Sequence, residues 1–311
     1  MNKSKHYPNF LTIQMSHSAQ AVRALIAQAA GVHSSDTMMY PGSMPIGLMR
    51  AHVPLVRQAY VCSPKADGVR VLVWHACNHI QLFNRKWELV HSYSSPSVAE
   101  PSIYDAEFLP ASHRLLLFDI IAQHGRITTS LCYTQRHAML QPLTVFGAGS
   151  VEVKPIGLAK DCAQLLRSAT YPTDGVIFTQ LLRAYTPGRQ DAGQIVKWKN
   201  TLDCTCDFEL LEDSRGTAFV HPGVPGSMAS MLRPEGPPFL GAVCNGKVVC
   251  LASLYHDTDF TPGTIVECAY MSGLGWSVER VRDDKSNPNN MKTVLQTMQS
   301  IIEDVQLEEL Q

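Results

Sequence analysis

From residue 55 to residue 121 the sequence is a succession of short apolar runs separated by turn-forming residues. The runs are rich in Val, Leu, Ile and aromatic residues, and most alternate apolar with polar positions, as strands with one buried face do. The run 114–121 is almost continuously apolar, which predicts a strand covered on both faces. The pattern therefore predicts an α+β fold built mainly on antiparallel sheets. The expected strands are LVRQAYVC, VRVLVWHA, HIQLF, WELVHS, SIYDAEFL and RLLLFDII.

Helical patterns flank these strands. The segment HSAQAVRALIAQAA (17–30) repeats small apolar residues at helical spacing and stops before Gly31, which is suited to a helix C-cap. Two further helical patterns, at about 130–141 and 157–169, surround a short VEVKPI strand. The runs TDGVIFTQ and QIVKWKN predict the last strands of a first domain, which we place at 1–200.

After residue 200 short strands alternate with connections rich in Pro and Gly. The pair Asn245-Gly246 predicts a tight hairpin. Five short strands of this kind favour a small barrel, and we expect an OB-fold β-barrel over 201–289. The last residues, 290–311, predict an amphipathic helix that docks back on a neighbouring core. The expected strand segments are CDFELLE, TAFVHP, GAVCNGKVVCLASL, GTIVECAYM and WSVERVR.

The bulk composition excludes several classes of protein. The net charge is −1 and the pI is near 6.9, so the chain has no global basic field for a nucleic acid. Nine cysteines without a paired zinc spacing indicate a reducing intracellular compartment. No apolar run is long enough to span a membrane and no apolar leader follows the N-terminus, so we expect no membrane association or secretion.

The segment SPKADGVR (63–70) places a lysine beside an Asp-Gly turn between two predicted strands. Lysine becomes a nucleophile when neighbouring positive charge or loss of hydration favours its neutral form. Cations occur at other strand ends, and Lys197 and Lys199 share one strand face because strand side chains alternate. Each such pair alone is typical of a solvated face. Together with paired carboxylates they suit a site for a triphosphate and a metal.

Six motifs occur in a fixed order along the chain: KADGVR, YDAEF, LLLFDI, TDGVIFT, IVKWK and ERVRDDK. The series resembles the nucleotidyltransferase motifs shared by DNA ligases, RNA ligases and mRNA capping enzymes. In that superfamily the lysine of K-x-D-G forms a covalent lysine–nucleotide intermediate. A single K-x-D-G occurs by chance in many proteins, whereas six ordered motifs are highly specific.

The flanking segments resemble mRNA guanylyltransferases more closely than ligases. YPGSMPIGLMR (40–50) is similar to the proline–glycine loop before the lysine motif of capping enzymes, and RVRDDKSNPNN is similar to their R-x-R-x-D-K-x-x-P-N ending. Ala106 stands where the family usually has glycine. Two residues, Asp203 and Asp207, are candidates for the acidic position after the K-W-K motif, and the sequence does not choose between them.

The resemblance implies a role for each matching residue around the nucleotide. Lys65 is implied as the nucleophile that accepts GMP. Arg70 and Glu107 are implied to hold the ribose hydroxyls. Phe118 is implied to stack on the guanine, with Asp119 beside it near the phosphates.

The resemblance also assigns residues to the phosphates and the metal. Arg85 is implied to meet the triphosphate beyond the α-phosphate, and Asp174 to help hold Mg²⁺ or Mn²⁺. Lys197 and Lys199 are implied to grip the α-phosphate and the base or its neighbours. Four residues of the barrel are expected to reach the pyrophosphate only when that domain closes: Arg280, Arg282, Asp284 and Lys285. Of these, Arg282 and Lys285 are expected to align the leaving pyrophosphate.

The implied activity is transfer of GMP from GTP to the 5′-diphosphate end of RNA through a covalent lysine–GMP. The chain contains no H-C-x-x-x-x-x-R phosphatase loop and no methyltransferase glycine motif. The resemblance therefore implies a separate RNA triphosphatase and a separate cap methyltransferase as partners, with the C-terminal tail of RNA polymerase as another partner. We expect a nuclear location, with a viral or cytoplasmic transcription site as the alternative.

Two other functions compete with this interpretation. An ATP-dependent polynucleotide ligase shares the six motifs but differs in the flanks. A catalytically inactive nucleotidyltransferase fold that binds RNA or polymerase is expected to have lost some of the lysine, carboxylates or arginines, and all of these remain. Labelling with GTP and with ATP distinguishes the three.

Overall fold

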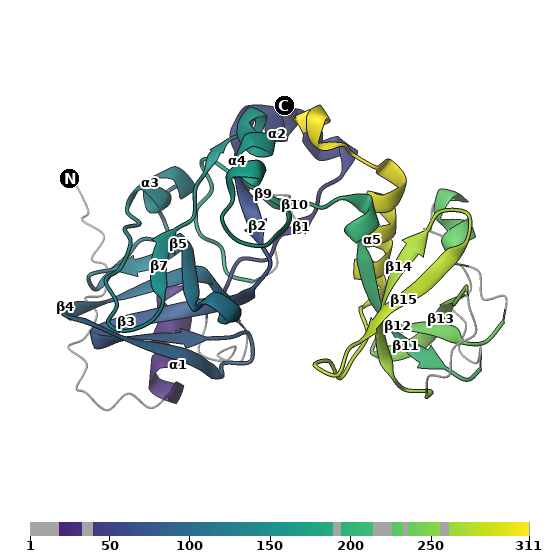
Figure 1. The fold of residues 1–311 in the computed structure, drawn as a ribbon, viewed down its shortest axis with the longest axis horizontal. Coiled ribbons are helices and arrows are strands. Elements are labelled where there is room, and N and C mark those ends of the chain that lie inside the picture. The colour runs from purple at the N-terminus through teal and green to yellow at the C-terminus, as the bar shows by residue number, and fades with distance from the viewer. Residues whose placement is uncertain are drawn as a thin grey trace, which may run out of the picture. The chain divides into compact units, whose positions relative to one another are not determined.

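The structure is a computed structural model (Figure 1). Its residues divide into two compact units. The N-terminal unit comprises Met1–Ile46, Pro54–Lys197 and Leu310–Gln311, and the C-terminal unit comprises Gly47–Val53 and Trp198–Glu309. The structure describes only part of these ranges. The boundaries expected from the sequence stay predictions. The residues that the structure describes are 19–32, 40–188, 194–213, 226–232, 236–255 and 261–310.

The N-terminal unit contains two antiparallel sheets, and one further strand pairs in parallel with the larger sheet. The strands of the first sheet, in spatial order, are β1 (Ile46–Gly47), β10 (Ile195–Trp198), β9 (Thr173–Gln180), β2 (Tyr60–Ala66) and β8 (Gly157–Leu158). The strands of the second are β3 (Val69–Phe83), β4 (Leu89–Leu109), β5 (Arg114–Gln123) and β6 (Arg126–Ile127), with β7 (Ser150–Val153) parallel to β5.

Alternation along the strands divides the core of the second sheet into two layers. Leu72 and Trp74 point to one face, where they share a core cluster with Val22 and Ile26 of helix α1 (Ala19–Ala29). Figure 1 shows this helix lying against the sheet of β3 and β4. The intervening apolar residues face the other side and pack against the segment 139–153. The nearly continuous apolar run of β5 is thus covered on both faces, as predicted.

The helices follow the sequence pattern with one correction. Helix α1 ends as expected before Gly31, whose φ of +83° is readily available only to glycine. The segment LVRQAYVC was expected to be a strand, but it begins as α2 (Val53–Ala59) and becomes β2 only at Tyr60. Pro54 lies in the first turn of α2, where its missing N–H costs no helical hydrogen bond. The remaining helices of this unit are α3 (Tyr133–Ala138) and α4 (Cys162–Ser168).

The C-terminal unit is a five-stranded antiparallel sheet. Its strands in spatial order are β13 (Lys247–Ser253), β12 (Phe239–Cys244), β11 (Thr205–Leu211), β14 (Ile265–Met271) and β15 (Gly275–Val281). The predicted hairpin joins β12 to β13, with positive φ at both Asn245 and Gly246. Between the two edge strands the described residues show only one isolated bridge, Leu254 to Trp276, so the expected barrel is not closed by a continuous ladder.

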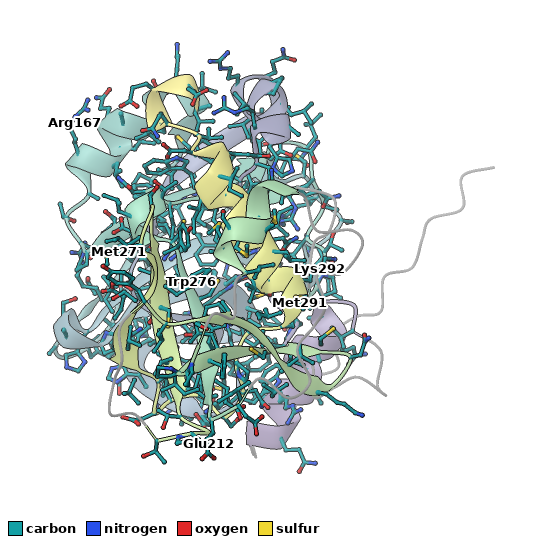
Figure 2. All side chains as sticks on the ribbon, turned by 90° about the vertical axis from the view of Figure 1, so that its right-hand side faces the viewer. Arg167, Glu212, Met271, Trp276, Met291 and Lys292 are labelled. Atoms are coloured by element: carbon teal, nitrogen blue, oxygen red, sulfur yellow. The ribbon has the colours of Figure 1, made fainter. Side chains whose placement is uncertain are left out.

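The terminal helix α5 (Met291–Glu303) packs on the core of this sheet. It begins at Asn290, whose side chain accepts a hydrogen bond from the backbone N–H of Thr293. Its residues Val294 and Met298 are fully buried in the same cluster as Trp276. Figure 2 labels Trp276 of β15 and Met291, the first residue of this helix. The helix is therefore part of the C-terminal unit's own core.

The predicted α+β class is confirmed: antiparallel sheets dominate both units. The expected strand TAFVHP lies outside the described residues. No helix in the described part of the chain is long and apolar enough to cross a membrane. The short 3₁₀ helices are Arg50–His52, Pro110–Ser112, Ala159–Asp161, Thr201–Asp203, Gly226–Met231 and Leu307–Leu310.

Candidate active site

The lysine of the K-A-D-G motif lies at the end of β2, where the pairing with β9 is interrupted by a bulge between Pro64 and Ala66. Bulges commonly redirect a side chain near an active site. The glycine of the motif has a steric cause, because a Cβ atom at Gly68 would lie 2.6 Å from the carbonyl oxygen of Phe108 in β4. The turn from β2 to β3 is therefore pressed against the neighbouring sheet.

Lys65 and Asp174 form a direct ion pair. The Lys65 Nζ atom lies 2.6 Å from Oδ1 and 2.8 Å from Oδ2 of the carboxylate. Both side chains keep about a quarter of their surface exposed, 25% and 24%, so solvent and ligands can reach the pair. Asp174 sits near the start of β9, the strand adjacent to β2, which explains how residues far apart in sequence meet.

Arg70 is held mainly by Asp105, not by Glu107. Its Nε and Nη2 atoms donate to the two Asp105 oxygens at 2.9 and 2.6 Å, and its Nη1 donates to the carbonyl oxygen of Ser43. The hydroxyl of Tyr185 also donates to Asp105, at 2.8 Å. The guanidinium is thus fixed by three of its five donors. Its Nη1 also lies 3.9 Å from the Met44 sulfur. The predicted role of Arg70 toward the ribose stays a prediction.

The charges of Glu107 and Arg85 interact with each other and with that of Arg70. Burial raises the pKa of the Glu107 carboxyl, against the opposing effect of four nearby cations. Loss of hydration lowers the pKa of Arg85, and the neighbouring Arg70 lowers it further. Arg85 stands in the turn between β3 and β4, at the opposite end of this hairpin from the Arg70–Glu107 pair. Its charge nevertheless interacts with those of Arg70 and Glu107. The cations around Glu107 are Lys154, Arg70, Lys65 and Arg85.

The ring of Phe118 is contacted by two cations. The Arg70 Cζ atom lies 5.3 Å and the Lys154 Nζ atom 5.4 Å from its ring centre. Lys154 is only 4% exposed, and burial lowers the pKa of its ammonium to about 8, with the cations of Lys65 and Arg70 acting in the same direction as burial and Glu107 opposing it. Sequence reasoning missed this residue. The only local signal was a charged residue at the end of the short VEVKPI strand.

Asp119 is engaged in a buried pair with Arg136. The Arg136 Nε and Nη2 atoms donate to its two oxygens at 2.7 and 3.0 Å, and Arg136 is fully buried. The backbone N–H of Ile120 donates to the same carboxylate. This geometry gives Asp119 a structural partner, and its expected position near the phosphates stays a prediction.

Lys197 lies in β10, two strands from β2 in the same sheet, and Lys199 follows the end of that strand in the C-terminal unit. Both side chains are half-buried. Ala106, which replaces the family's glycine, is fully buried in β4 and its φ is not positive, so alanine is accommodated there.

The C-terminal unit gathers its predicted residues around one buried carboxylate, that of Asp207. Arg282 Nη1 donates to Asp207 at 2.7 Å, Lys285 donates to its other oxygen, and the Asn289 side chain donates at 3.1 Å. Asp203 belongs to a short 3₁₀ helix and is exposed. The structure thus brings Asp207, and not Asp203, into contact with Arg282 and Lys285 of the last motif.

The flanking motif residues complete this cluster. Arg282 also donates to both oxygens of Asp284, at 2.8 and 2.9 Å. These contacts hold the pKa of Asp284 well below its usual range. Arg280 pairs with Glu267 at 2.7 Å and is largely exposed. Arg280, Arg282 and Lys285 therefore each pair with a carboxylate of their own unit, and Asp284 is one of the carboxylates that pair with Arg282.

The donor set around Lys65 fits a magnesium-type ion. Mg²⁺ is usually bound by one or two carboxylates together with substrate phosphates, and not by a full protein cage. The described residues contain no cluster of three or more His, Cys, Asp or Glu side chains that could hold a metal alone. Asp174 does hold a cation in this structure, the Lys65 ammonium. Its carboxylate can accept a divalent ion in the same way.

Two family models match the chain. One, described as mRNA capping enzyme, catalytic domain, matches residues 11–144, and the other, described as mRNA capping enzyme, C-terminal domain, matches residues 246–311. Curated proteins named mRNA-capping enzyme subunit alpha are also similar. That of Saccharomyces cerevisiae is 23% identical over 88% of this chain and 78% of its own length, and that of Neurospora crassa is 24% identical over 92% and 87%.

Solved structures resemble the chain more distantly. A mycobacterial DNA ligase D complexed with ATP and MES has a TM-score of 0.44 and 16% sequence identity, and the match covers 79% of this chain and 96% of that one. The family assignment therefore depends on the sequence matches, which cover more than half of the chain and include both of its units. The chain belongs to the mRNA capping enzyme family.

Proposed function

We propose that the protein is an mRNA guanylyltransferase that transfers GMP from GTP to the 5′-diphosphate end of RNA through a covalent Lys65–GMP intermediate. The central observation is that Lys65, near the end of β2, contacts Asp174 and belongs to the group of four cations that surround Glu107. The matches to proteins named mRNA-capping enzyme support GTP and RNA ends as substrates.

The reaction consists of two successive transfers of one guanylyl group, each by substitution at its phosphorus. In the first, the lone pair of Lys65 Nζ forms a bond to the α-phosphorus of GTP while the bond to pyrophosphate breaks, and the amine loses a proton. In the second, an oxygen of the RNA diphosphate attacks the same phosphorus, the P–N bond breaks, and the amine is regenerated. Phosphoryl transfer depends chiefly on alignment and charge neutralisation, so the surrounding cations supply most of the catalysis.

Lys154 and Phe118 together suit a guanine base. The Phe118 ring offers a stacking face, and the ammonium of Lys154 lies against the same ring. Guanine presents two acceptors, O6 and N7, on one edge, whereas adenine replaces O6 with an amino donor. A buried lysine beside the stacked base therefore favours GTP over ATP.

The metal and the partner proteins stay proposals. Asp174 is the residue that fits a divalent cation, and an ion bound there supplies neutralisation of phosphate charge. A 5′-diphosphate acceptor implies an RNA triphosphatase activity upstream and a cap methyltransferase activity downstream. Use of nascent RNA favours a nuclear location, with contact to the tail of RNA polymerase.

Adduct labelling tests the proposal directly. The protein is incubated with α-³²P-GTP or α-³²P-ATP and a divalent ion, then denatured and separated by electrophoresis. We expect label from GTP alone, and none in Lys65→Ala, while Lys160→Ala, a change at an exposed lysine, labels normally. Label from ATP alone indicates the ligase reaction, and label retained in Lys65→Ala contradicts the assigned nucleophile.

A further inference from the structure

The hydroxyl of Tyr40 is buried without a hydrogen-bond partner among the residues that the structure describes. Tyr40 begins the proline–glycine loop, and its ring packs 6.2 Å from that of Trp87, in the turn that also holds Arg85. A buried hydroxyl that forms no hydrogen bond is costly to the free protein. A ligand that supplies the missing partner removes this cost.

The loop fixes the Tyr40 ring close to Arg70. A Cβ atom at Gly42 would lie 2.4 Å from the Tyr40 Cε1 atom and 3.2 Å from the Arg70 Nη2 atom. These two atoms are therefore at most about 5.6 Å apart, the sum of the two distances. The absence of a side chain at Gly42 therefore leaves the space that the Tyr40 ring and the Arg70 guanidinium occupy beside the loop.

The charged groups around Tyr40 are those of the nucleotide site. Burial and the nearby Asp105 carboxylate raise the pKa of the Tyr40 hydroxyl far above its usual range, against the effect of Arg70 and Arg85, and Glu107 acts with Asp105. The hydroxyl is therefore protonated at any physiological pH and available as a donor. Arg70, in contrast, has committed three of its five donors to Asp105 and Ser43.

We propose that the Tyr40 hydroxyl is a further substrate-binding group that hydrogen-bonds a ribose hydroxyl of the guanine nucleotide and so selects ribose over deoxyribose. This inference rests on the proposed guanylyltransferase function. A hydroxyl–hydroxyl contact suits the site, because the neighbouring Arg70 and Glu107 are the residues implied at the ribose. The phosphates are bound by several cations and do not need a neutral hydroxyl donor. The contact replaces the partner that the free protein lacks.

The experiment compares Tyr40→Phe with wild type in adduct formation from GTP, 2′-deoxyGTP and 3′-deoxyGTP. The matched control is Tyr171→Phe, which removes another buried, unpartnered hydroxyl whose charged neighbours are Arg114 and Glu152. We expect kcat/KM for GTP to fall roughly tenfold in Tyr40→Phe. For the deoxy analogue that lacks the contacted hydroxyl, kcat/KM of Tyr40→Phe is expected to equal that of wild type. Tyr171→Phe is expected to match wild type with all three nucleotides.

The thermal midpoint of the free protein provides a second readout. Because Tyr40→Phe removes an unpaired buried hydroxyl, we expect an unchanged or higher midpoint, which separates the substrate contact from a folding defect. An equal loss with all three nucleotides, or no loss with GTP, overturns the ribose contact and leaves the guanylyltransferase function standing. A wild-type protein that forms no adduct with GTP overturns both.

Discussion

The Nζ atom of Lys65 and the carboxylate of Asp174 form a two-pronged contact, at 2.6 and 2.8 Å. The proposed nucleophile is thus held by the carboxylate that we assign to the divalent cation. A cation or the arriving substrate must take over Asp174 before the amine can attack. Metal binding and release of the nucleophile are therefore coupled at one side chain.

Asp174→Asn tests this coupling. The neutral amide cannot replace the carboxylate charge, so we expect Lys65–GMP formation to fall by about 10²–10³-fold, and added Mn²⁺ not to restore it. The measurement is the single-turnover rate of adduct formation over a metal titration. Glu152→Gln, which breaks the more exposed pair with Arg114, serves as control and should keep the wild-type rate. Full activity of Asp174→Asn at high metal would disprove the assignment.

Lys154→Met tests the buried lysine through pH. Below pH about 8 the Lys154 ammonium is charged in both the folded and the unfolded state, so its burial lowers the free energy of unfolding. Between pH about 8 and 10.5 only the unfolded state still binds the proton, so the free energy of unfolding of the wild type rises with pH. We expect Lys154→Met to increase the free energy of unfolding at pH 7 by up to about 3 kcal/mol, and this gain to vanish as pH rises through 10.5. Urea titrations at several pH values measure it.

The same variant should also lose the preference for GTP over ATP in adduct labelling. Lys160→Met, at an exposed position, is the control for both measurements. If Lys154→Met kept the preference for GTP but showed the expected stability profile, Lys154 would be a buried charge that does not contact the base.

Asp119→Asn tests whether this carboxylate serves the fold or the phosphates. The change leaves the buried guanidinium of Arg136 without its ionic partner, which costs about 3–5 kcal/mol of stability. The double variant with Arg136→Met should recover part of that loss. Denaturant unfolding gives these values. Loss of adduct formation at unchanged stability would instead support the phosphate role implied by the family resemblance.

Asp207→Asn and Asp203→Asn form a matched pair. Asp207 accepts hydrogen bonds from Arg282, Lys285 and Asn289, so its loss should lower stability by about 1–3 kcal/mol and slow adduct formation at unchanged GTP affinity. Asp203 is exposed, and its change should stay within about 0.5 kcal/mol. Thermal unfolding and nucleotide-binding titrations measure both. Equal effects of the two changes would contradict the central position of Asp207.

Local signals in the sequence predicted local structure well. Gly31 and Asn245-Gly246 were placed correctly because their positive φ values are required by the turns themselves. The segment 55–59 was mistaken for a strand because its apolar residues run into those of β2, and only Pro54 before it marks a helix start. Short apolar runs do not separate helix from strand by periodicity alone.

The predicted site was limited in the same way. The motif series led to Lys65, but Lys154 could not be found, because the parallel pairing of β5 with β7 brings it to Phe118. That pairing joins segments more than thirty residues apart, and no residue beside either segment indicates in the sequence that the two pair. Likewise, nothing beside Asp119 in the sequence shows that Arg136 is its partner.

The close approach of Gly68 to β4 limits how the lysine loop can be redesigned. A library that randomises residues 63–70 to change the accepted nucleotide should return glycine at position 68 under any selection, because every other side chain meets the Phe108 carbonyl. Asp67, exposed beside it, is the better position for diversity.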